Sequence, residues 1–193
     1  MPERQAHGFD YEKLIVKKYN LFPSQDTQFD AETANGTPVQ IKCIKQNSSI
    51  DLGDYYRNKT KKKDFILIIG FWKGQKNNIV KEHIIHVNHK TWNSLFRYSK
   101  AEEMKDELKA ISNNYSDDGK WKLFMQKHKY YWNKQKRRVQ LRFKRDHDSQ
   151  KRIQCAINKT DFYNYFIKWE YVQDVQTTTN FIQSQKLQEV AFI

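Results

Sequence analysis

Residues 30–45 read DAETANGTPVQIKCIK, and this stretch decides the fold of the first half of the chain. Asn35-Gly36 is a strong signal for a tight turn between two antiparallel strands. After the turn, apolar and polar residues alternate, which is the period of a β-strand with one buried face. The stretch therefore predicts a β-hairpin, in which the side chains of Gln40 and Lys42 project from the same face.

Helices and strands are predicted on both sides of this hairpin. Residues 9–20 have apolar side chains near helical spacing and predict a helix that ends before Pro23. A short helical turn is expected from Ser49, and the apolar run FILIIGFW (65–72) predicts a strand covered on both faces. The remaining predicted elements of this half are a strand over 79–87 and helices over 91–96 and 102–111. Together they predict an α/β fold.

The second half of the chain carries most of the positive charge. The protein has 193 residues and a formal net charge of +13, and residues 120–152 contain thirteen Lys and Arg against Asp146 and Asp148. Aromatic side chains are interleaved with these cations, so the region favours a nucleic-acid partner. A solvated basic face is the bland alternative, and an anionic membrane surface is a third. The alternating segments 138–145 and 151–158 predict a second hairpin.

Length and composition indicate the number of domains and the cellular location of the protein. We expect one domain over 1–193, with a first part over 1–114 and a second over 115–193, divided at the polar run 115–119. The longest apolar run has eight residues, far short of the roughly 20 that cross a bilayer. The N-terminus has no apolar signal region, so we expect a cytoplasmic protein with no membrane contact. Its two cysteines, Cys43 and Cys155, predict reduced thiols.

The first hairpin also carries a candidate catalytic constellation. Pairing across the turn brings the Asp30 carboxylate to the Gln40 side-chain oxygen and the Lys42 ammonium, with Glu12 on the preceding helix. Mg²⁺ needs few protein ligands, so Asp30, Gln40 and the backbone carbonyl of Ile41 would suffice. The ion would polarise a phosphate while Lys42 orients the attacking water. The alternative is an ordinary hairpin whose polar residues face solvent.

The order of elements resembles a known family. A helix, a hairpin with D30…Q40-I41-K42, a short helix and a buried strand resemble the core of the PD-(D/E)xK nuclease superfamily over roughly residues 8–90. The amide before x-Lys is similar to the MspI-like restriction endonucleases, in which a late basic hairpin follows, as 140–154 does here. This chain departs from that pattern with Phe29 in place of Pro and Arg145 in place of a Gly pair.

The resemblance implies a restriction-endonuclease-like core, with a mixed central β-sheet flanked by helices and a basic C-terminal β-hairpin recognition region. It implies a Mg²⁺-dependent type II restriction endonuclease acting on double-stranded DNA, with 1–114 as catalytic core and 115–193 as recognition region. Restriction enzymes of this size act as monomers and as homodimers, so both states stay open. A homing endonuclease or junction resolvase on the same core is an alternative, as is a non-catalytic basic nucleic-acid-binding protein.

DNA contacts are expected in two places. By the resemblance, the late hairpin enters the major groove, where Arg pairs with guanine and Gln with adenine, although many such side chains contact only phosphate. Residues just after the catalytic strand are expected to contact phosphates near the scissile bond. The candidate DNA-binding residues are Ser48, Ser49, Arg57, Asn58, Gln140, Arg142, Lys144, Arg145, Gln150 and Arg152.

Overall fold

A mixed five-stranded sheet forms the centre of the protein. The computed structural model describes residues 3–74, 78–96, 101–111, 118–129, 139–145 and 151–167. Helix α1 (Glu3–Tyr19) precedes the sheet, whose strand order is β1-β2-β3-β5-β6. Its strands are β1 (Phe22–Pro23), β2 (Ala31–Glu32), β3 (Pro38–Lys45), β5 (Phe65–Trp72) and β6 (Ile79–Val87). Only β3 and β5 pair in parallel; the other neighbours are antiparallel. The predicted α/β class and the first hairpin are confirmed.

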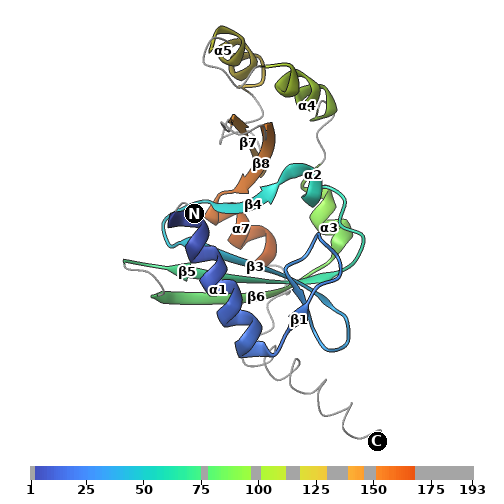
Figure 1. Cartoon of the computed structure of the whole chain (residues 1–193), viewed down its shortest axis with the longest axis vertical. Helices are drawn as coiled ribbons and strands as arrows, with labels where there is room; N and C mark the ends of the chain where they lie inside the picture. Colours follow the sequence, from blue (N-terminus) through green and yellow to red (C-terminus); the bar gives the residue numbers. More distant parts are fainter. Residues whose placement is uncertain are drawn as a thin grey trace, which may run out of the picture.

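The hairpin between β2 and β3 forms as its turn sequence predicts. Gly36 has a φ of +77°, which glycine adopts without a steric penalty. Ala31 pairs with Val39, which sets the register of the hairpin. Helix α1 covers one face of the sheet, and Figure 1 shows it lying across the strands. Because side chains alternate along β3, Val39 and Ile41 pack under α1, whereas Gln40 and Lys42 lie on the opposite face.

A second, three-stranded sheet packs against the face opposite α1. Its strand order is β4-β8-β7, and both pairs are antiparallel. Its strands are β4 (Ile50–Asp54), β7 (Val139–Arg145) and β8 (Lys151–Ile157). The helical turn predicted from Ser49 is wrong, because residues 50–54 are a strand that pairs with β8, a hundred residues later. Helix α2 (Tyr55–Asn58) begins only after Asp54, whose carboxylate accepts a hydrogen bond from the Arg57 amide at 3.0 Å.

The remaining helices contact both sheets. They are α3 (His89–Ser94), α4 (Ala101–Ala110), α5 (Asp118–Lys127), α7 (Lys159–Phe162) and the π-helical turn η2 (Tyr163–Ile167). Helix α3 and η2 contact β5 and β6, respectively, whereas α4 and α5 contact β8 and β7. Asn158 caps α7, because its side-chain oxygen accepts a hydrogen bond from the Asp161 amide at 2.8 Å. In Figure 1, β7 and β8 rise from the central sheet towards α4 and α5, which lie at the far end of the protein. Among the described residues, no helix has the length and apolar character needed to span a bilayer.

Candidate active site

The structure brings together the hairpin residues that the sequence singled out. The Asp30 amide donates to the Val39 carbonyl at 3.0 Å, which continues the β2–β3 pairing by one residue. Its carboxylate oxygen Oδ2 accepts from the Ile41 backbone amide at 2.7 Å and from the side-chain amide of Gln40. Asp30 is therefore held against Gln40 and Ile41, but Gln40 presents its amide nitrogen to Asp30, whereas the predicted constellation needs the amide oxygen there.

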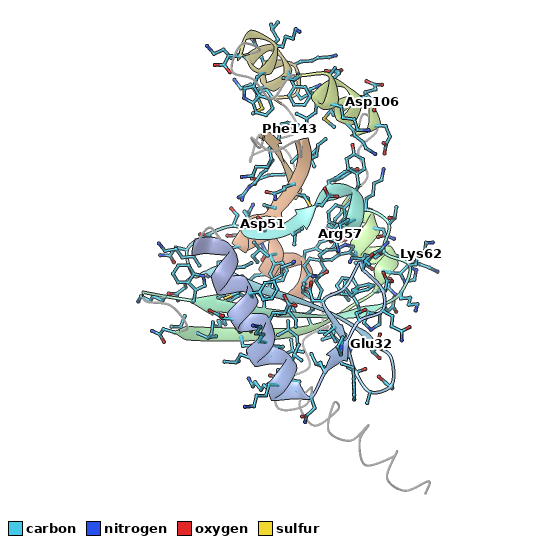
Figure 2. All side chains as sticks on the ribbon, in the orientation of Figure 1. Glu32, Asp51, Arg57, Lys62, Asp106 and Phe143 are labelled. Atoms are coloured by element: carbon cyan, nitrogen blue, oxygen red, sulfur yellow. The ribbon has the colours of Figure 1, made fainter. Side chains whose placement is uncertain are left out.

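These residues line a small pocket between β3 and the β4–α2 segment. The pocket has a volume of about 80 Å³. Arg57, which Figure 2 labels, belongs to the α2 part of this segment. Three cations and two carboxylates line the pocket, so its formal charge is slightly positive. The lining residues are Gln28, Asp30, Gln40, Lys42, Leu52, Gly53, Asp54, Arg57, Asn58 and Lys61.

Lys42 leaves its ammonium available to a ligand. It is half-buried, lies on the same face of β3 as Gln40 and lines the pocket. Among the residues that the structure describes, no hydrogen bond or ion pair engages its Nζ atom. An ammonium has three donors, so those of Lys42 can bind a phosphate oxygen or a water molecule in the pocket.

Lys61 is a pocket residue that the sequence analysis missed. Its side chain is only 2% exposed, and Nζ lies 3.4 Å from Gln40 Oε1 and 3.9 Å from the centre of the Phe29 ring. Burial first, and then the nearby charge of Lys42, lower the pKa of Lys61, while Asp30 opposes them; together these effects place the pKa at about 8. In the sequence, Lys61 belongs to a Lys-rich run over 59–63 that gives no sign of burial.

Glu12 is close to the pocket but does not line it. Helix α1 covers the other face of the sheet, and Glu12 is absent from the described lining residues. Burial raises the pKa of the Glu12 carboxyl, and the negative charge of Asp30 raises it further, while Lys42 lowers it. Glu12 is therefore within electrostatic range of Asp30 and Lys42, without direct access to the same pocket.

The oxygen atoms at Asp30 fit a hard cation after one rearrangement. No cluster of three or more His, Cys, Asp or Glu within the described ranges could hold a metal ion. The predicted ligands are Asp30, the Gln40 oxygen and the Ile41 carbonyl, all oxygen ligands of the kind Mg²⁺ prefers, and Asp54 is a second carboxylate that lines the same pocket. The Ile41 amide points to Asp30, and the carbonyl of an extended residue points to the same side as its amide. Gln40 presents its nitrogen to Asp30, so its amide must turn over to offer oxygen.

The second sheet has one apolar and one polar face. Val139, Leu141 and Phe143 belong to the core, whereas the alternate residues of β7 lie on the other face. On that face, Arg142 is half-buried and Lys144 is exposed. Gln154 of β8 pairs directly with Arg142 and is a polar neighbour that the sequence analysis did not select. The polar face therefore offers two cations and an amide to a ligand.

Several predicted DNA contacts have other surroundings. Gln140 is only 3% exposed, which does not fit direct contact with a base. Asn58 is buried, and its amide donates to the Leu52 and Asp54 carbonyls, both at 2.7 Å, so it fastens α2 to β4. Gln150 and the side chains of Arg145 and Arg152 lie outside the described part of the chain.

The other predicted phosphate-binding residues lie in the β3–β4 loop and on α2, where they are exposed or half-buried. Ser48 is exposed in the β3–β4 loop, where its backbone amide donates to the Lys45 carbonyl at 2.9 Å, and Ser49 is half-buried beside it. Arg57 is exposed, lines the pocket and donates to the Thr27 carbonyl. These side chains stay candidates for phosphate binding.

Comparison with known proteins adds no family to this description. No protein-family model matches the chain, and neither curated proteins nor solved structures yield a match. The function must therefore be argued from the pocket and its surroundings.

Proposed function

We propose that the protein is a Mg²⁺-dependent type II restriction endonuclease that hydrolyses double-stranded DNA at a short specific sequence. The observation that carries the proposal is the contact of Asp30 with Gln40 and Ile41 on the wall of a pocket that also holds Lys42. The hairpin position of these residues supports the proposal, because the PD-(D/E)xK resemblance implies a catalytic site on such a hairpin. The mixed sheet around it is compatible with a restriction-endonuclease-like core.

Four residues that line the pocket, together with the Ile41 carbonyl, would have roles in this reaction. Asp30, the Gln40 oxygen and the Ile41 carbonyl would hold the ion, and bound Mg²⁺ would polarise the scissile phosphate and acidify a water molecule. Lys42 would donate to the attacking water or to a phosphate oxygen, because its ammonium has no described hydrogen bond. Arg57 would neutralise the charge of the DNA backbone at the edge of the pocket.

The size of the pocket favours a phosphodiester over a whole nucleotide. Its volume of about 80 Å³ is far below the roughly 300 Å³ or more of typical small-molecule pockets. A phosphate group can enter while sugar and base stay outside. Bases can then be contacted by the polar face of the second sheet, with Arg142, Lys144 and Gln154, because β4 joins this sheet to the pocket. A polymeric substrate such as duplex DNA uses both surfaces.

The proposal is tested by cleavage of unmethylated phage DNA in Mg²⁺. We expect discrete frequent fragments from the wild type and a loss of about a thousandfold or more in rate for Asp30→Asn and Lys42→Ala. DNA affinity should persist in both variants, because most phosphate contacts lie elsewhere. Lys45→Ala is the matched control, since Lys45 is an exposed lysine of the same strand outside the pocket. Wild-type rates in Asp30→Asn and Lys42→Ala would contradict the proposal.

A non-catalytic nucleic-acid-binding protein is the second candidate, and one observation favours it. The Asp30 carboxylate already accepts two hydrogen bonds from β3, as it would in a purely structural hairpin. Salt-sensitive DNA binding without metal-dependent cleavage would support this candidate. Within the nucleases, a single rare cut would indicate a homing endonuclease, and a preference for branched DNA would indicate a junction resolvase.

A further inference from the structure

The ammonium of Lys61 is buried, and no carboxylate of the described residues forms an ion pair with it. Its described contacts are the Gln40 side-chain oxygen, the Gln28 backbone carbonyl and the ring of Phe29. No ion pair of Lys61 occurs within the described ranges. A lysine that is only 2% exposed normally has an opposite charge beside its ammonium. The neutral contacts around Lys61 therefore leave its charge only partly compensated.

The side-chain amide of Gln40 lies between this cation and Asp30. Its oxygen faces Lys61, and its nitrogen donates to the Asp30 carboxylate. The reverse orientation would bring the amide nitrogen against a group that only donates, and the amide oxygen against a carboxylate oxygen. Lys61 and Asp30 thus fix the amide together, with its oxygen turned away from Asp30.

We propose that Lys61 is an internal counter-cation of the candidate metal site, which competes with a divalent ion for the side-chain oxygen of Gln40. This inference rests on the proposed ion at Asp30. For Asp30 and Gln40 to hold one ion, the amide must turn over, and Lys61 then loses its acceptor. The ammonium also repels the incoming ion across a poorly hydrated space. Lys61 therefore keeps metal affinity low in the protein without DNA.

The test is the affinity of the full-length protein for Mn²⁺ without DNA, measured by isothermal titration calorimetry. Lys61→Met keeps the unbranched side chain as far as Cε and removes the charged Nζ, so we expect Mn²⁺ to bind on the order of tenfold more tightly than in the wild type. Lys62→Met is the matched control, because Lys62 is the next residue and is exposed, as Figure 2 shows at the edge of the protein. Its Mn²⁺ affinity should stay within about twofold of wild type, since water screens its charge.

Two further variants make the result specific. Asp30→Asn combined with Lys61→Met should abolish the gain, because the added affinity belongs to the ion at Asp30. Lys61→Gln retains a donor for the Gln28 carbonyl and replaces Lys61→Met if circular dichroism shows that the methionine variant does not fold. Wild-type or weaker Mn²⁺ binding by the folded variant would overturn the inference.

Cleavage of DNA separates this inference from the proposed function. Tighter Mn²⁺ binding by Lys61→Met, together with no cleavage by the wild type, would support the counter-cation and reject the nuclease. Cleavage by the wild type, together with unchanged Mn²⁺ affinity in Lys61→Met, would support the nuclease and reject the counter-cation.

Discussion

Each face of the central sheet has a charged side chain that is largely shielded from water, and the two charges have very different partners. On the α1 side, Glu82 of β6 accepts hydrogen bonds from Tyr11 at 2.9 Å, Lys18 at 2.8 Å and Tyr19 at 2.6 Å. On the pocket side, Lys61 contacts neutral groups, with its amide contact at 3.4 Å. A fully satisfied charge fastens a helix to a sheet, whereas an incompletely satisfied charge can still interact with a ligand.

The two environments also have opposite effects on the charged forms: one favours charged Glu82, and the other disfavours charged Lys61. Burial raises the pKa of Glu82, but hydrogen bonds from Lys18, Tyr19 and Tyr11 outweigh it and leave the pKa below its ordinary value. The charged form of Glu82 is thus favoured by folding. The charged form of Lys61 is disfavoured, because its pKa falls to about 8. The comparison separates a structural ion pair from a candidate functional cation.

The largest expected effect on stability comes from adding a side chain at Gly70, where α1 packs closely against the sheet. A Cβ atom on Gly70 of β5 would overlap the ring of Tyr11. Gly70→Ala should therefore displace Tyr11 from Glu82 and lower the free energy of unfolding by about 2–4 kcal/mol in urea titrations. Gly8→Ala is the control, because no atom lies within 4 Å of the added Cβ. That change should raise helix stability by about 0.5–1 kcal/mol. Equal stability of the two variants would refute the close approach.

A smaller effect is expected from neutralising the satisfied charge. Glu82→Gln should lower the free energy of unfolding by about 2 kcal/mol at pH 7, because three donors lose a charged acceptor. Since folding lowers the pKa of Glu82, its contribution is present above the ordinary pKa of about 4.5 and is lost as pH falls through the lower folded pKa. Urea titrations at pH 7 and pH 3 should show the difference between variant and wild type shrinking in acid. A difference independent of pH would contradict the assigned pKa.

The smallest effect on stability is expected on the pocket side. At pH 7, Lys61→Met should lower the free energy of unfolding by no more than about 1 kcal/mol, and an increase also fits. The reason is that the removed charge is poorly compensated. Folding lowers the pKa of Lys61 from 10.5 to about 8, so the unfolded chain binds more protons between these values. Wild-type stability should therefore gain from Lys61 as pH rises from 8 to 10.5. Urea titrations of both proteins at pH 7.5 and pH 10 measure this gain, and an identical pH dependence would contradict it.

The sequence correctly predicted those helices, strands and turns whose pattern lies within the element itself. The turn at Asn35-Gly36, the helix before Pro23 and the apolar run 65–72 each carry their own signal, and each forms. Strand β4 was missed because Asp51, Gly53 and Asp54 resemble a turn when taken alone. Its partner β8 lies a hundred residues away, and the pairing contains an irregularity between Asp51 and Gly53.

The candidate site was predictable in part for the same reason. Hairpin geometry and a period of two place Asp30 beside Gln40 and set Lys42 on the same face, so spacing alone was sufficient. The role of Lys61 depends on which lysine of the run 59–63 points inward, and this is decided by the packing of Phe29 and the β4–α2 segment. Burial of Gln140 likewise follows from tertiary packing rather than from its strand pattern.

Strand β4 is part of both the pocket wall and the second sheet. Leu52 and Gly53 form a wall of the pocket, and the same strand is hydrogen-bonded to β8 at the edge of the second sheet. If the protein is the proposed nuclease, a shift of β8 on binding a base sequence would pass through β4 to the pocket wall. Strands β7 and β8 without residues 50–54 would lack this connection.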